Sequence, residues 1–337
     1  MKKKLIIHIG FPKTATTSLQ LNLFSDLYKD RKLEYLNHLN VKSPYLGNIE
    51  VKNVVKYITS NIRSSAVEKE LKFLKQLPAG NYLISSENIS FFYESFTWGY
   101  TSERTLDNFH RIKELFSDIF NDIEFLIGIR AHINLIPSFY RQQYQHMVVE
   151  NPKFKKFNHW LDFSLSEKSL SGELLLLNYT IVYRRIVDLF GKDKIHILVF
   201  EDLFNNPDDF YNQLATFFGV SKIFIEDSLS KEKINVGTRA LGNYITSQPT
   251  INQKYIGPIR YVIKKVFSQK IFNIGAKYFG LLMPTNILNK STGKGLVLDG
   301  ITEEQLQKIY SAYKDSNLEL MNLAGLEYEK FIKYKYI

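Results

Sequence analysis

The feature that most constrains the fold is the stretch KLIIHIGFPKTATTSLQ, which runs from Lys4 to Gln20. It opens with a short apolar run that ends at Gly10, a pattern typical of a strand buried on both faces of a parallel sheet. Beyond this glycine the apolar residues Leu19, Leu23 and Leu27 recur at helical spacing. The stretch therefore predicts a strand, a tight turn and the start of a helix, which is the repeating unit of an α/β fold.

The turn itself carries a lysine and a series of hydroxyl side chains. A strand that feeds the N-terminus of a helix presents free backbone N–H groups and the positive end of the helix dipole. With these groups, the turn predicts an anion site, most naturally for phosphate, at Lys13, Thr14, Thr16, Thr17 and Ser18. The alternative is a Thr- and Ser-rich helix cap beside a surface lysine. The turn is not a Walker A loop, because that pattern places its lysine after the second glycine and directly before the magnesium-binding hydroxyl.

The sequence GFPKTATTSLQ resembles the 5′-phosphosulfate loop of sulfotransferases, which use 3′-phosphoadenosine 5′-phosphosulfate (PAPS) as donor. The family motif is Pro-Lys-[Ser/Thr]-Gly-Thr-Thr, and Ala15 departs from it where the family has glycine. The resemblance, strongest to bacterial carbohydrate-type members, implies a P-loop-like central parallel sheet flanked by helices, with a mostly helical C-terminal part. It also implies that Lys13 is catalytic and contacts the leaving group, and that the donor phosphate is held by Lys13, Thr14, Ala15, Thr16, Thr17 and Ser18. The product would be adenosine 3′,5′-bisphosphate (PAP), and no metal would be needed.

A second apolar strand, predicted over residues 81–86, is followed directly by Glu87. Ligands of open α/β sheets bind at the carboxyl ends of the strands, so Glu87 is expected on the same rim as Lys13. A carboxylate beside an anion site is costly unless it has a role, and a general base is the obvious role. The family resemblance supports this, since many glycan sulfotransferases have a glutamate at this strand end. Alternatively, Glu87 caps the following helix or pairs with a nearby lysine.

A third strand, predicted over residues 124–129, ends at Arg130, and Ser138 follows within the next predicted helix. An arginine can bind a phosphate through two parallel hydrogen bonds, and a serine one or two turns into the helix can reach the same group. In the sulfotransferase family this arginine-to-serine spacing binds the 3′-phosphate of the donor, and RAHINLIPS matches that spacing. Alternatively, Arg130 forms a salt bridge at the strand end.

Later landmarks match the family less closely. Glu201, after a fourth strand predicted over 194–200, is expected to fix loops behind the donor site rather than to bind the donor. Asn235 and Arg239 correspond to a family loop that closes over the 3′-phosphate and adenine, although the family's Arg-Lys-Gly pattern is missing. Tyr179 and Tyr183 lie where the family often has a tyrosine near the donor or acceptor. The aromatic run at 91–100 is either core or the lining of an acceptor cleft.

The remaining helices are predicted from apolar periodicity and capping residues. They span residues 67–77, 104–120, 133–149, 180–190, 208–218 and 304–324, and Thr302 and Gln305 form a capping box before the last one. Residues 151–178 are expected to be loop-rich. The whole chain, 1–337, is expected to be a single sulfotransferase domain, within which 245–295 is a variable insertion or an acceptor subdomain.

Composition bounds the partners without choosing among them. The formal net charge of +10 suits an anionic partner, such as a phosphorylated donor, an acidic glycan, a membrane surface or nucleic acid. Cysteine is absent, so disulfides, thiol catalysis and cysteine-based zinc sites are excluded, and the His spacing predicts no metal site. We expect a cytoplasmic protein, with peripheral membrane contact as a weaker expectation, since neither a signal sequence nor a membrane span is evident. The oligomeric state is not predicted.

Two rival functions predict other features. A P-loop kinase or related phosphotransferase requires the Walker A spacing that is missing here. A non-catalytic module that binds phosphate or nucleic acid needs no carboxylate at the strand rim, and its basic residues would gather in one stripe with aromatics. Only residues 245–295 hint at such a stripe, so the sequence favours sulfuryl transfer to a glycan or other hydroxyl-bearing acceptor, without a nucleic-acid partner.

Overall fold

A computed structural model describes residues 2–36, 51–61, 63–90, 102–150, 152–166, 174, 177–230, 244–245, 297–298 and 301–337. The chain divides into two compact units. The first contains Met1–Leu135, Glu167–Val236 and Tyr310–Ile337, and the second contains Ile136–Ser166 and Gly237–Ile309. A single domain over residues 1–337 stays a prediction. Its insertion or acceptor subdomain at 245–295 lies, apart from residue 245, outside the described residues.

The first unit is built on a parallel sheet in which the structure describes five strands, in the order β2-β3-β1-β4-β5. Leu5 in the central strand is paired with Tyr82 on one side and with Ile123 on the other. The predicted P-loop-like parallel sheet, flanked by helices, is thereby confirmed. The strands are β1 Lys3–Gly10, β2 Glu34–Tyr35, β3 Gly80–Ser85, β4 Asp122–Ile129 and β5 Ile195–Val199.

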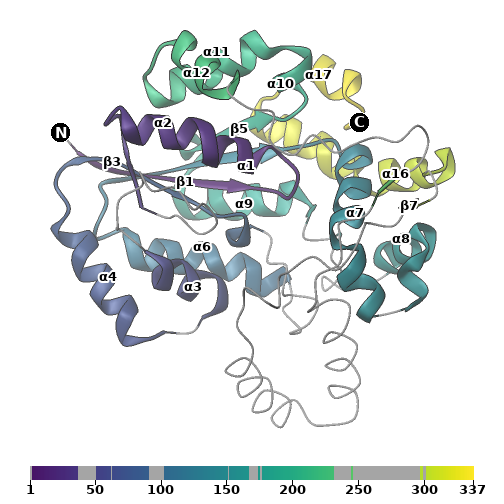
Figure 1. The fold of residues 1–337 in the computed structure, drawn as a ribbon, viewed down its shortest axis with the longest axis horizontal. Helices are drawn as coiled ribbons and strands as arrows, with labels where there is room; N and C mark the ends of the chain where they lie inside the picture. The colour runs from purple at the N-terminus through teal and green to yellow at the C-terminus, as the bar shows by residue number, and fades with distance from the viewer. Residues whose placement is uncertain are drawn as a thin grey trace, which may run out of the picture. The chain divides into compact units, whose positions relative to one another are not determined.

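One face of the sheet is covered by the helix that follows β1 and by two helices that follow β5 (Figure 1). Ile6 and Leu126 of the sheet belong to the same apolar cluster as Phe24 and Leu214 of these helices. Phe24 and Leu214 are fully buried, and each such burial stabilises the fold by about 1.5–3 kcal/mol. The elements on this face are α1 Thr16–Ser18, the π-helix η1 Leu19–Leu23, α2 Phe24–Lys29, α10 Asp202–Asn205, α11 Pro207–Phe218 and α12 Lys222–Ser230.

The opposite face carries α6 and α9, with α3 beside them (Figure 1). Phe125 on β4 is fully buried, and its ring centroid lies 6.1 Å from that of Phe109 and 4.8 Å from that of Phe190. Burial on both faces explains why the strands read as continuous apolar runs rather than as alternating patterns. The elements on this side are α3 Lys52–Ser60, α4 Ser65–Gln76, α6 Ser102–Phe116 and α9 Tyr179–Phe190.

Most helices lie where their periodicity predicts them, but the prediction is wrong in four places. The stretch predicted as loop-rich at 151–178 contains α8 Phe157–Ser166, and neither α12 nor α17 Tyr328–Lys333 was predicted. The helix predicted over 104–120 ends at Phe116. The helix ends predicted from glycine agree better with the structure. Gly219 ends α11 with a φ of 65°, a backbone conformation that favours glycine.

The described part of the second unit is mostly helical. It contains most of α7 His132–Glu150, the short helix η3 Pro152–Lys155, α8, and the start of α16 Glu303–Ala324. Trp160 is fully buried against Tyr140, with ring centroids 5.1 Å apart. The predicted capping box at α16 is confirmed, because Thr302 N donates to Gln305 Oε1 (2.9 Å) and Gln305 N donates to Thr302 Oγ1 (3.3 Å). The two-residue strands β6 Tyr244–Ile245 and β7 Val297–Leu298 pair antiparallel.

The C-terminal part of the chain continues as helix through α16 and α17, which agrees with the predicted helical C-terminal part. Across the ranges that the structure describes, we find no helix with the length and apolar character needed to cross a membrane.

Candidate functional site

The carboxyl ends of the parallel strands meet at one rim of the sheet, and the loop after β1 occupies its centre. Because β1 lies between β3 and β4, this loop has Glu87, which follows β3, on one side and Arg130, which follows β4, on the other. Two backbone hydrogen bonds tie the three strand ends together, from Ser86 N to His8 O (3.0 Å) and from Phe11 N to Gly128 O (3.5 Å). The structure thus places three predicted site segments next to one another.

The loop owes its shape to two residues with left-handed backbone conformations. Lys13 has a φ of 69° and Ala15 a φ of 63°. Ala15 is also the N-cap of α1, and its methyl side chain cannot accept a hydrogen bond from the first-turn amides. A non-glycine residue in this conformation costs roughly 1–2 kcal/mol. This strain explains why the sulfotransferase motif, as quoted above, has glycine where this chain has Ala15.

Two glycines make room for the loop's threonines. A Cβ atom on Gly10 would lie 2.5 Å from Thr16 Cγ2, and one on Gly128 would lie 2.9 Å from Thr14 Oγ1. Both threonines are buried, and the Thr14 hydroxyl donates to Phe11 O at 2.7 Å. Thr14 and Thr16 therefore hold the loop closed through packing and an internal hydrogen bond, whereas Thr17 and Ser18 are half-buried on the same helical turn.

Arg130 contacts the loop directly. Its Nη1 donates to Lys13 O at 3.0 Å, and its guanidinium carbon lies 4.5 Å from the centroid of the Phe200 ring. The Tyr179 hydroxyl donates to Arg130 O (2.6 Å) and accepts from Arg130 N (3.3 Å). Burial raises the pKa of Tyr179, so this hydroxyl keeps its proton. Tyr179 also packs edge-on against Phe11, with ring centroids 4.5 Å apart, and so bridges the loop and the arginine.

Glu87 begins the short 3₁₀-helix η2 Glu87–Ile89 and is half-buried. The Ser90 hydroxyl at the end of this helix donates to Gly10 O at 3.4 Å, which ties the Glu87 segment to the end of β1. Behind this segment, Ser85 Oγ lies 2.7 Å from His8 Nδ1 and accepts from Gln20 Nε2 at 2.9 Å. Complete burial lowers the pKa of His8 to about 3, so its ring is neutral and acts as a structural partner.

Glu201 has the structural role that the sequence predicts. It is buried, and it accepts hydrogen bonds from Ala131 N (3.0 Å) and from the Tyr336 hydroxyl (2.9 Å). Burial raises the pKa of this carboxyl group, an effect that its two hydrogen-bond donors oppose. The carboxylate thereby fixes the chain immediately after Arg130.

The structure does not test three of the other predicted donor-site residues. Ser138 is a buried residue of α7 and belongs to the second unit, so its partnership with Arg130 stays a prediction. Asn235, Arg239 and the aromatic run at 91–100 lie outside the described residues. Tyr183 is buried and donates to Leu323 O at 3.3 Å, which is a packing role.

Sequence reasoning missed the supporting residues His8, Gln20 and Tyr336. A histidine within an otherwise apolar central strand was the only local signal for the first, because it must find a partner when buried. The contacts of Gln20 and Tyr336 join positions far apart in the chain, for which a single sequence carries no signal.

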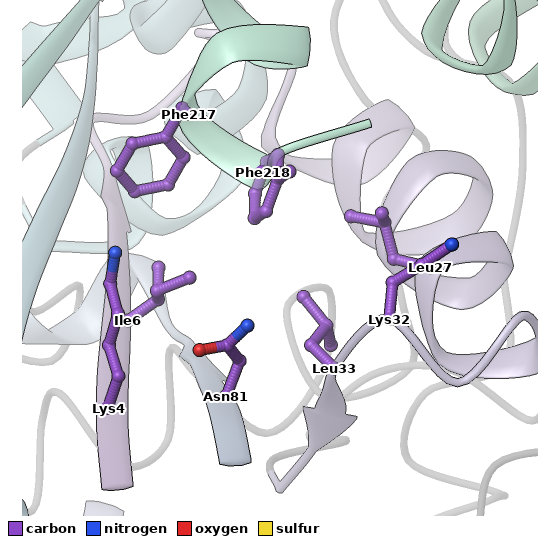
Figure 2. A pocket seen from close by; sticks show the side chains of 8 residues that line it. All are labelled: Lys4, Ile6, Leu27, Lys32, Leu33, Asn81, Phe217 and Phe218. Carbon is purple, nitrogen blue, oxygen red and sulfur yellow. The ribbon is translucent and has the colours of Figure 1, made fainter. Parts of the chain in front are cut away.

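A small cavity lies at the opposite end of the strands and is not the candidate site. It measures about 20 Å³, roughly the space of one water molecule, and Figure 2 shows Lys4, Asn81 and Phe217 around it. Lys4 and Asn81 stand near the starts of β1 and β3, and Lys4 is paired with Glu124 at 2.7 Å. The rim at the carboxyl ends of the strands therefore remains the candidate site.

The fold is that of a P-loop-like α/β protein, and its first loop contains two residues in left-handed backbone conformations. No family model matches the sequence, and no curated protein matches it.

Among solved structures, the chain is similar to a sulfotransferase from Alicyclobacillus acidocaldarius, with 15% identity, a TM-score of 0.38, and coverage of 66% of this chain and 83% of that one. It is also similar to the sulfotransferase domain of the olefin synthase from Synechococcus PCC 7002, with 15% identity, a TM-score of 0.34, and coverage of 84% of this chain and 98% of that one.

Proposed function

We propose that the protein is a sulfotransferase that moves a sulfuryl group from PAPS to a hydroxyl or amine of an acceptor, with a glycan as our first candidate. The observation that carries the proposal is the placement of the Lys13 loop between Glu87 and Arg130 on one rim. The resemblance of PKTATT to the 5′-phosphosulfate motif adds the identity of the donor. A cytoplasmic location and the lack of a nucleic-acid partner stay predictions.

The loop residues fit the phosphate group of such a donor. The left-handed turns at Lys13 and Ala15 give the backbone a conformation in which successive N–H groups can converge on an anion. Helix α1 continues through η1 and α2 to Lys29, so the helix dipole adds its positive end at the same place. We assign Lys13, Thr17 and Ser18 to the 5′-phosphate side of the donor, with Thr14, Ala15 and Thr16 shaping the loop.

Arg130 is assigned to the 3′-phosphate. Its guanidinium is anchored on the loop side by the Lys13 carbonyl and lies over the Phe200 ring. A fork of donors held in this way is preorganised for a phosphate, which a lysine at the same place would not reproduce. We propose Ser138, Asn235 and Arg239 as further ligands of this group.

The chemical step needs a base and a stabiliser of the leaving group. The donor supplies the sulfuryl group, whose bond to the bridging phosphate oxygen breaks as the acceptor oxygen bonds to sulfur. Glu87 takes the proton from the attacking hydroxyl. Lys13 and the amides of its loop stabilise the negative charge that develops on the phosphate oxygen. Glu87 and Lys13 are thus the proposed catalytic residues.

Nucleotide binding tests the assignment of Arg130. We expect PAP to bind at least tenfold more tightly than AMP in calorimetry, because a charge-assisted hydrogen bond contributes about 1.5–3 kcal/mol, or roughly 10- to 150-fold. Arg130→Lys should bring the affinity for PAP close to that for AMP, whereas the control Arg184→Lys, at a largely exposed arginine of α9, should not. Equal affinities for PAP and AMP in the unaltered protein would rule the proposal out.

Turnover tests the assignment of Glu87. Glu87→Gln should keep PAP affinity while the transfer rate falls by about 10²–10⁴-fold, the usual contribution of a general base. A transfer assay with labelled sulfate, run over oligosaccharides, lipids and phenols, would measure this rate and identify the acceptor. Near-normal turnover of the variant would move the base elsewhere, and activity confined to small phenols would contradict a glycan acceptor.

A further inference from the structure

The C-terminal end of the chain is hydrogen-bonded to Glu201, which in turn accepts a hydrogen bond from the segment that carries Arg130. Tyr336 has only 1% of its surface exposed, and its ring stacks on Phe331 at 4.6 Å. Its hydroxyl donates to Glu201 Oε2 at 2.9 Å. A tyrosine hydroxyl buried at this depth normally finds a partner, but here the partner is a buried carboxylate on a loop at the rim, 135 positions away in the chain.

Further hydrogen bonds connect Glu201 to the loop that contains Lys13. Glu201 Oε1 accepts from Ala131 N at 3.0 Å, and Ala131 is the fully buried neighbour of Arg130. Arg130 Nη1 in turn donates to Lys13 O at 3.0 Å. Three consecutive hydrogen bonds therefore lead from Tyr336 through Glu201 and the Arg130 segment to Lys13.

A second route joins the same two regions. Asn317 Nδ2 donates to Tyr336 O (2.9 Å) and also lies 3.2 Å from His132 Nδ1. His132 follows Ala131 directly, and its ring stacks on Tyr313 with centroids 3.7 Å apart. Since Nδ1 of His132 accepts from the amide, its Nε2 carries the proton and donates to Leu177 O at 2.9 Å. Ala131 and its neighbour His132 are thus both connected by hydrogen bonds to the C-terminal part of the chain.

We propose that Tyr336 is a positioning residue of the donor site, which orients Glu201 so that its carboxylate fixes the Ala131 amide and holds Arg130 against the Lys13 carbonyl. The hydrogen bonds from Tyr336 to the Arg130 segment are contacts within the protein and do not depend on a ligand. The expected effect of Tyr336 on the binding of PAPS and PAP rests on the proposed function. Burial of Glu201 makes its orientation sensitive to Tyr336, because a buried carboxylate oxygen that loses the Tyr336 hydroxyl has little solvent to replace this donor.

The test compares two tyrosines of the same segment. Tyr336→Phe removes the hydroxyl and keeps the ring on Phe331. Tyr334→Phe is the matched control, because Tyr334 is also buried and donates to Asp202 Oδ1 at 2.8 Å, next to Glu201. Asp202 keeps a second partner in Lys330 at 3.0 Å. Tyr334→Phe therefore removes a hydrogen bond of the same C-terminal segment but leaves the hydrogen bond between Glu201 and Ala131 in place.

Hydrogen exchange of the peptide that contains Ala131 is the first readout. We expect exchange in Tyr336→Phe to be about tenfold faster than in the unaltered protein and in Tyr334→Phe. The second readout is PAP binding and steady-state kinetics. Tyr336→Phe should weaken PAP binding about tenfold and raise the KM for donor, with kcat and the acceptor KM unchanged.

Each outcome has a distinct meaning. Unchanged exchange in Tyr336→Phe, or equal responses of the two variants in both readouts, would overturn the inference. If exchange responds as expected but the unaltered protein does not bind PAP, the positioning link is supported and the proposed function is wrong. If exchange responds and PAP binding does not, the link is structural only and Tyr336 is not a positioning residue of the donor site.

Discussion

Gly10 is the position at which one added methyl group should disturb the loop most. It is the last residue of β1, and its φ is not among the positive values, so alanine suits its backbone. An added Cβ, however, would lie 2.5 Å from Thr16 Cγ2 and 3.1 Å from Thr16 Oγ1. Contacts below 3.0 Å force one group to move, and here the group that must move belongs to the first turn of α1.

The expected loss of stability follows from two opposing terms. Overpacking of a buried site costs about 1–3 kcal/mol. Replacing a strand glycine by alanine gains about 0.5–1 kcal/mol. Gly10→Ala should therefore lower the free energy of unfolding by up to about 2.5 kcal/mol. It should also weaken PAP binding, because the displaced turn carries Thr17 and Ser18. Urea unfolding followed by circular dichroism, together with calorimetry, measures both effects.

The control and the rescue make this prediction specific. Gly80→Ala, at the start of β3, should be neutral or stabilising, because its nearest contact would be Tyr82 at 3.7 Å. Thr16→Ser removes Cγ2 and keeps the hydroxyl, so in the Gly10→Ala background it should restore part of the loss. The two changes should couple by about 0.5–3 kcal/mol, as expected for side chains in contact. Strictly additive effects would refute the close approach of Gly10 and Thr16.

Two shorter predictions concern strain and pH. Ala15→Gly should raise the free energy of unfolding by about 0.5–1 kcal/mol, since relief of the left-handed strain exceeds the added flexibility of the unfolded chain, and a loss of stability in urea unfolding would contradict the strain. His8 and His132 are both buried, with pKa values lowered to about 3, so the unfolded chain binds protons that the folded chain excludes. Stability should be independent of these rings above about pH 6.5 and fall as the pH drops from there towards 3. His8→Leu should make the fall of the urea midpoint shallower in this window, and an unchanged slope would show that the ring is not buried neutral.

The sheet and its rim were predictable because their signals are local. Strands buried on both faces read as apolar runs, so β1, β3, β4 and β5 stand out in the sequence, and parallel pairing then brings the residues after each strand to one edge. This logic placed Glu87, Arg130 and Glu201 on the rim with Lys13. The sequence does not show that Lys13 and Ala15 adopt left-handed conformations, because neither residue type requires one.

The missed helices have a common physical cause. Ile223 of α12 is 69% exposed, Phe163 of α8 is 49% exposed and Ile332 of α17 is 44% exposed. Apolar residues on the outer side of a helix blur the periodicity from which the helix would be recognised. The links of Tyr336 to Glu201 and of Gln20 to Ser85 were hidden for a different reason, since they depend on tertiary contacts that leave no local pattern.

The strand order also explains how one rim can hold the proposed base, Glu87, and the proposed phosphate ligand, Arg130, together. Neighbouring strands lie about 4.8 Å apart, so the ends of β3 and β4, with β1 between them, are separated by about 10 Å. Glu87 and Arg130 therefore start from opposite sides of the loop, as our assignment of Glu87 to the acceptor and of Arg130 to the donor requires. The next strand, β5, adds Glu201 on the far side of Arg130, where it binds the Ala131 amide. A carboxylate placed there fixes the backbone next to Arg130 and lets the guanidinium donate to the carbonyl of Lys13 in the loop, as the proposed donor site needs.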